Sequence, residues 1–64
     1  MNEYQKKIVE LMQAAGLNID TCERALFYLE TTAQQTEMIK FLEQNPSLSA
    51  MHIMAKVKEL TIHI

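Results

Sequence analysis

A complete helix signature, NEYQKKIVELMQAAGL, occupies residues 2–17. Asn2 is a favoured N-cap residue, and Gln5 follows it at the spacing of a capping box. Between the two ends of the stretch, apolar residues recur at the steps of one helix face: Tyr4, Ile8, Leu11, Met12 and Ala15. Gly16 tolerates the positive φ that often ends a helix, and Leu17 can fold back onto the last turn. The stretch predicts a helix over residues 3–15.

A second helix is predicted over residues 20–31. Asn18 and Asp20 are both candidates for its N-cap, and Asp20 also has a glutamate at the spacing of a capping box. The expected inward stripe is Cys22, Ala25, Leu26 and Leu29. Phe27 and Tyr28 lie outside that stripe, so the helix is apolar nearly all round. Such a helix is either central in a bundle or has a second face covered by a partner.

A third helix is predicted over residues 33–44. Thr32 with Gln35 forms a capping box at its start, and Thr31 with Gln34 is the alternative. The expected inner stripe, with Ile39 beside it, is Ala33, Met38, Phe41 and Leu42. The Asn-Pro pair that follows ends the helix, because the residue before a proline is biased away from the helical region.

A fourth helix is predicted over residues 47–60. Ser47 is the expected N-cap; alternatively, Asn45 is the cap and Pro46 takes the first helical position. The residues expected to face the core are Ala50, Ile53, Met54, Val57 and Leu60. The alternating, β-branched residues 61–64 leave three outcomes open: they extend the helix, pack as a strand or fray.

Together these segments predict one all-α domain spanning residues 1–64, a compact bundle of four short helices. The chain has a single Gly and a single Pro, fewer turn-forming residues than sheets with tight turns require. The one cysteine excludes an intrachain disulfide, so dense packing or self-association must stabilise so short a chain. The residues expected to be most buried are Ile8, Leu11, Leu26, Leu29, Phe41, Leu42, Met54 and Val57.

Composition argues against several classes of function. The net charge is −2, and the six basic residues are spread along the chain, which disfavours DNA binding by bulk electrostatics. The N-terminal segment has the periodicity of a helix and not the apolar run of a signal peptide. No run approaches the roughly 18 apolar residues of a membrane span. A lone cysteine fits a reducing compartment, so we expect a cytoplasmic protein.

No pattern indicates catalysis, a cofactor or a metal ion, and we expect no small-molecule substrate. Cys22 is in register with the second helix's inward stripe, which favours a core residue over a reactive thiol. His52 and His63 are eleven residues apart, about 16 Å along one helix, too far for one metal ion. Phosphate loops, nucleophile elbows and zinc spacings are absent from the sequence. Met38, Met51 and Met54 favour core filling, with an adaptable binding groove as the alternative.

Three segments carry a family resemblance: Leu11-Met12-Gln13-Ala14-Ala15-Gly16-Leu17, then Ala25-Leu26, then Phe41-Leu42. They resemble the ubiquitin-associated three-helix domain, which has a Met-Gly-Phe-type loop after its first helix and apolar pairs at the two later positions. The resemblance covers about half of the chain. Here the loop reads Ala-Gly-Leu, without the family's Met and aromatic residue, and a fourth helix is added. The resemblance implies shared three-helix packing and an adaptor module as one alternative function.

The third and fourth helices with their short link are also similar to a helix-turn-helix, which makes a small DNA-binding regulator another alternative. Its recognition face is only weakly basic: Ser49, His52, Lys56 and Glu59.

The leading hypothesis is a non-enzymatic, cytoplasmic protein-interaction domain whose partner is another protein or a second copy of the chain, with a homodimer favoured. Its motivation is the second apolar face of the helix over residues 20–31, because an exposed apolar patch usually marks an interface. Phe27 and Tyr28 are expected near the two-fold axis, with Ile39, or Ile62 and Ile64, at the rim. The alternative is that the fourth helix and its tail cover this face within one chain.

Overall fold

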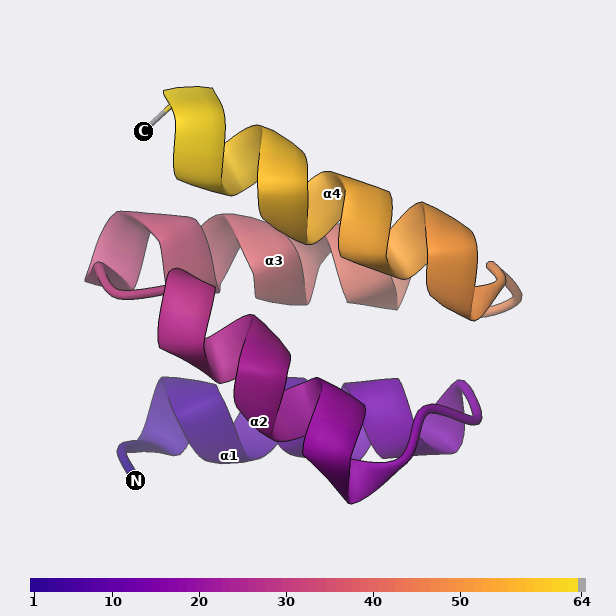
Figure 1. Cartoon of the computed structure of the whole chain (residues 1–64). Coiled ribbons are helices and arrows are strands. Elements are labelled where there is room, and N and C mark those ends of the chain that lie inside the picture. Colours follow the sequence, from indigo (N-terminus) through magenta and orange to yellow (C-terminus); the bar gives the residue numbers. More distant parts are fainter. Residues whose placement is uncertain (64) are drawn as a thin grey trace.

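Figure 1 shows the computed structural model, which describes the backbone of residues 1–63 and the side chains of residues 1–62. Its helices are α1 (Glu3–Ala14), α2 (Ile19–Tyr28), α3 (Thr32–Gln44) and α4 (Ala50–His63). The predicted all-α bundle of four short helices is confirmed for the described residues. Three predicted boundaries differ from the structure by three residues: α2 ends earlier than expected, and α4 both begins and ends later.

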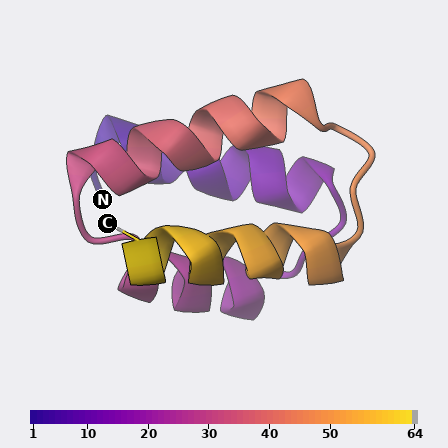
Figure 2. The same ribbon diagram turned by 90° about the horizontal axis from the view of Figure 1, so that it is seen from above.

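Each helix packs against two of the other three. Helix α1 contacts α2 and α3, and α4 contacts the same two helices, so the four form a closed ring. Figure 2 shows α1 and α3 running in one direction and α2 and α4 running in the opposite one. The N-terminus and the end of α4 therefore lie at the same end of the bundle.

Helix α1 begins and ends as its sequence predicts. The Asn2 side chain accepts a hydrogen bond from the Gln5 amide (2.7 Å), and the Gln5 side chain accepts one from the Asn2 amide (2.8 Å). At the other end Gly16 has a φ of 96°, in the region that favours glycine. The Leu17 amide reaches back to the Met12 carbonyl at 3.0 Å, and the Leu17 side chain is buried. The complete Schellman end is therefore encoded locally.

The N-cap of α2 is Asn18, whose side chain accepts a hydrogen bond from the Thr21 amide at 2.8 Å. The other candidate, Asp20, is wrong as a cap because it lies within the first turn of the helix. Its carboxylate there still lies near the positive end of the helix dipole.

Helix α2 stops at Tyr28 because the residues that follow it form the N-terminal cap of α3. Thr31 takes an extended conformation and forms a capping box with Gln34, which confirms the alternative pair and makes Thr32 with Gln35 wrong. Gln35 instead donates from its side chain to the Leu29 carbonyl at 2.8 Å, so it satisfies the end of α2.

The expected starts of α4 at Ser47 or Pro46 are also wrong. A turn closed by the Leu48 amide and the Asn45 carbonyl (3.4 Å) precedes the helix. Ser49 then supplies its carbonyl to the Ile53 amide at 3.1 Å. At its other end α4 continues through His63, so helix extension is the observed outcome for the tail up to that residue.

The core fills the centre of the ring. Of the residues expected to be most buried, half are in the core: Ile8, Leu29, Leu42 and Val57. The other half are only partly buried: Leu11, Leu26, Phe41 and Met54. The centre is completed by Met12, Leu17, Cys22, Ala25, Met38, Ile53 and Leu60.

Three residues of the expected inner stripes are exposed, because they lie in first turns at the ends of the bundle: Tyr4, Ala33 and Ala50. Each helix thus presents a narrower face to the centre than its apolar pattern predicts.

Two glutamines are buried at the end of the bundle where the N-terminus lies, and the sequence did not predict them. Gln35 of α3 joins the two cap residues Asn2 and Leu29, because it accepts a hydrogen bond from the Asn2 side chain (3.4 Å) while it donates to the Leu29 carbonyl. Gln34 donates to the Leu60 carbonyl of α4 at 3.4 Å. Every buried side-chain polar atom in the described part of the chain has a partner.

Candidate interaction surface

The outward face of α2 carries two exposed aromatic residues. Phe27 is 76% exposed and Tyr28 is 45% exposed, whereas Cys22, Ala25 and Leu29 on the other side of the helix are fully buried. The two aromatic rings meet edge to face, with centroids 5.4 Å apart and planes at 88°. That arrangement is a favourable one for aromatic pairs, so the two rings hold each other in place outside the core.

Helix α4, which packs against α2, has an outer face that is apolar except for one lysine. Met51 and Ile62 are exposed, and with Ala55 and Lys58 they follow steps of four, three and four residues. This spacing places all four on one side of a helix, as in the seam of a coiled coil. Ile62 belongs to this face because α4 continues beyond residue 60, an outcome that the sequence left open.

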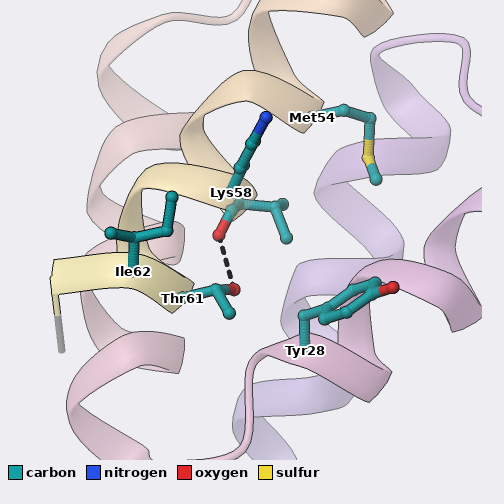
Figure 3. Close-up of a pocket in the computed structure, with 6 residues that line it drawn as sticks. Tyr28, Met54, Lys58, Thr61 and Ile62 are labelled. Carbon is teal, nitrogen blue, oxygen red and sulfur yellow. Dashed lines mark hydrogen bonds between the residues drawn. The ribbon is translucent and has the colours of Figure 1, made fainter.

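An open, largely apolar groove of about 350 Å³ lies between the end of α2 and the C-terminal half of α4. Figure 3 shows Tyr28 on one side of this groove, with Met54, Lys58, Thr61 and Ile62 of α4 around it. The Thr61 hydroxyl donates to the carbonyl of Val57 at 2.8 Å and is thereby satisfied within the helix. Among the described residues that line the groove, Lys58 is the only one with a charged side chain.

We call the groove together with the neighbouring Phe27 the α2–α4 surface, defined by Phe27, Tyr28, Met54, Lys58, Thr61 and Ile62. Sequence reasoning named Phe27, Tyr28 and Ile62; the structure places Tyr28 and Ile62 on one groove and Phe27 against Tyr28. It missed Lys58 and assigned Met54 to the core. The helical spacing of Met54, Lys58 and Ile62 was the available signal, but it depends on where α4 ends.

Two other predicted interface residues are not part of this surface. Ile39 is partly buried on α3, a helix that contacts α1 and α4 but not α2. Ile64 lies outside the described residues.

Cys22 is a core residue with no features of a nucleophile. Its side chain is fully buried beneath the first turn of α2. Desolvation by burial is the largest influence on the thiol and raises its pKa above the usual 9.0. Its own backbone amide lowers the pKa, and the charge of Glu23 raises it. The thiol is therefore protonated at neutral pH, as expected for a small apolar residue.

His52 serves the start of α4. Its Nδ1 lies 2.8 Å from the Ser49 hydroxyl oxygen, and that oxygen lies 3.5 Å from the His52 amide. In the part of the chain that the structure describes, no three His, Cys, Asp or Glu side chains are grouped as metal ligands would be. The side chain of His63, the other histidine considered, is not described.

The face expected for DNA recognition has its charge largely compensated. Lys56 pairs with Glu59 at 3.3 Å and lies 5.4 Å from the centre of the Phe41 ring. Lys56 also borders a shallow hollow of about 210 Å³ between α3 and α4, where the second lysine, Lys40, pairs with Glu37 at 3.6 Å. Phosphate binding at either lysine would have to compete with a carboxylate that is already present.

Comparisons with protein-family models, curated proteins and solved structures found no match to this chain. The similarity to the ubiquitin-associated domain therefore rests on the sequence segments alone. Leu17, at the position of that family's loop aromatic, is buried against the core. Within residues 1–63, none of the helices combines the length and the apolar character needed to cross a membrane.

Proposed function

We propose that this chain is a protein-interaction domain without catalytic activity that self-associates through the α2–α4 surface. The observation that carries the proposal is the pair of exposed aromatic rings of Phe27 and Tyr28 beside an apolar groove. Leaving aromatic and aliphatic surface in water is unfavourable, and contiguous apolar patches on soluble proteins usually mark interfaces.

The size of the molecule fits self-association. A stable interface buries about 800 Å² on each partner. That is roughly a fifth of the 4204 Å² of accessible surface of this chain. Most soluble oligomers are symmetric, and the two-fold dimer is the commonest. For so small a domain, covering this surface also adds stability that its own core cannot provide.

We propose a reducing compartment such as the cytoplasm as the place of action. The supporting observation is the free thiol of Cys22, which is buried and has no second cysteine in the sequence to pair with.

The test is the molar mass in solution over a wide concentration range, measured by light scattering coupled to size exclusion. The parent chain should shift from monomer to dimer, and a Phe27→Ser Tyr28→Ser variant should remain a monomer. The matched control is Tyr4→Ser on α1, since Tyr4 is as exposed (43%) as Tyr28 (45%) but does not line the groove. A parent chain that stays monomeric at millimolar concentration would exclude the proposal.

The same preparations separate this proposal from the DNA-binding alternative. A regulator of that kind would bind random duplex at low salt and lose affinity steeply as salt is raised. Our proposal expects no such binding, because the net charge is −2 and both lysines of the α3–α4 hollow are paired with glutamates.

A further inference from the structure

The α2–α4 surface contains both a projection and a cavity, and they lie side by side. The Phe27 ring extends from the face of α2 that points away from the core. The neighbouring Tyr28 ring is in edge-to-face contact with it, and Tyr28 is also a wall of the groove. Figure 3 shows that wall facing the side chains of α4. Phe27 itself is not a lining residue, so the ring does not fill its own groove.

A two-fold interface requires that one patch of surface be complementary to itself. A projection and a cavity that are adjacent on one face meet this requirement, because rotation about an axis between them exchanges their positions. On the basis of the proposed self-association, we infer that two copies of this chain pair about such an axis. The Phe27 ring of each copy then occupies the groove of the other, and the interface contains two identical contacts.

The groove has the size and chemistry for an aromatic ring. A cavity of about 150 Å³ with apolar walls accommodates a benzene molecule, and this groove measures about 350 Å³. The incoming ring would meet the thioether of Met54 and the aromatic face or edge of Tyr28. Sulfur–aromatic and aromatic–aromatic contacts are both favourable beyond the burial of area alone.

The charges on the two halves of the surface are opposite. On the exposed face of α2, Glu23 lies one turn before Phe27 and Asp20 two turns before it, so the projection is accompanied by carboxylates. The groove is lined by Lys58, and Arg24 lies between the two halves, one turn before Tyr28 and three residues before Phe27. Neither of these basic residues forms an ion pair with a described residue. In a two-fold dimer, the carboxylates of each copy face the basic residues of the other. This attraction favours a second copy over an uncharged partner.

The first test is complementation between two variants. Phe27→Ala removes the projection and keeps the groove, whereas Thr61→Trp fills the groove and keeps the projection. Each variant alone loses both contacts, and its dimer dissociation constant should rise about tenfold or more. An equimolar mixture regains one contact, so the mixed dimer should have a dissociation constant between those of the parent and of either variant.

The second test uses charge and disturbs only exposed side chains. Lys58→Glu and Glu23→Lys each place like charges together in their own dimers and should weaken association. Mixing the two restores both opposite-charge pairs, so the mixed dimer should form preferentially and lose that preference at high salt. Circular dichroism of each variant verifies that the helices are intact.

The outcomes separate the arrangement from the proposed function. A parent chain that dimerises, while neither mixture binds more tightly than its separate variants, would overturn the seating of Phe27 and leave self-association standing. A monomeric parent would remove both. Recovery in the two mixtures would establish the reciprocal arrangement, because a face-to-face stack of Phe27 rings regains nothing on mixing.

Discussion

Both faces of α2 carry apolar side chains, but the surroundings of those side chains differ. Cys22, Ala25 and Leu29 on the inner face are fully buried, whereas Phe27 and Tyr28 on the outer face are largely exposed. The larger side chains are thus on the outside. If stability alone determined their placement, the aromatic rings would be the ones in the core, because they bury the most apolar area. We infer that the inner face stabilises the fold and the outer face is available for association.

The largest expected effect is at the inner face. Leu29→Ala should lower the free energy of unfolding by about 2–5 kcal/mol, because it removes buried methyl groups and leaves a cavity. Leu26→Ala on the same helix is the matched control and should cost less, since Leu26 is only partly buried. Thermal and chemical unfolding followed by circular dichroism measures both. Equal losses would mean that the two positions do not differ in burial.

At the end of α2 the buried Leu29 is followed by α3, and it directly follows the exposed Tyr28. The substitution Gln35→Leu tests how the end of this helix is stabilised. Losing the side-chain donor leaves the Leu29 carbonyl without its partner at a buried site, a cost of about 1–3 kcal/mol. Because Tyr28 is the last residue of the helix, this substitution should weaken association as well as stability. Unfolding and light scattering on one preparation measure both. A change in stability alone, or in association alone, would mean that the end of α2 does not position the α2–α4 surface.

The start of α2 distinguishes the two cap candidates. Asn18→Ala should cost about 0.5–2 kcal/mol, because it removes the acceptor for the Thr21 amide. Asp20→Ala should cost less, about 0.3–1 kcal/mol, since only the interaction with the helix dipole is lost. The two losses are compared from the midpoints of urea unfolding, provided that the dependence of the unfolding free energy on urea is the same in both variants. A larger loss of stability for Asp20→Ala than for Asn18→Ala would mean that Asp20 is the N-cap.

The inner face also predicts a response to alkaline pH. Burial raises the pKa of the Cys22 thiol in the folded chain above 9.0, so the unfolded state loses its thiol proton first. The unfolded state then binds fewer protons, and stability falls as pH rises above the unfolded pKa. Compared with a Cys22→Ala variant, the parent should therefore lose stability more steeply above pH 9.0. Parallel pH profiles for the two chains would contradict the assignment.

The smallest expected effect on stability is at the outer face. Phe27→Ser should change the free energy of unfolding of the monomer by no more than about 0.5 kcal/mol, because the ring is exposed. Unfolding at low protein concentration, where the chain is monomeric, measures this. A large loss there would mean that Phe27 contributes to the fold and would make its role in association secondary.

Prediction from the sequence succeeded where the signal and its partner are close together in the chain. The capping box of Asn2 with Gln5 and the Schellman end at Gly16 were both predicted correctly. It failed at the end of α2, because Thr31 is a residue that either helix can use. The competing requirement came from α3, whose capping box needs Thr31 in an extended conformation.

The candidate surface was predicted in part for the same reason. The apolar pattern of α2 shows that Phe27 and Tyr28 lie away from its inward stripe, and this requires no knowledge of other helices. The groove beside them does require it, because its opposite wall is supplied by Met54, Lys58 and Ile62 of α4. Those residues lie near Tyr28 only because α4 packs against α2.

The sequence by itself determined four amphipathic segments, two of their local end structures and the outward position of an aromatic pair. Those features depend on backbone hydrogen bonds and side-chain spacing within a few residues, which the chain order specifies directly. Only the tertiary structure decided which apolar residues fill the centre, where α2 stops and how Gln34 and Gln35 become buried. These outcomes depend on groups far apart in the chain, such as Gln34 and the carbonyl of Leu60, whose meeting is set by how the helices pack.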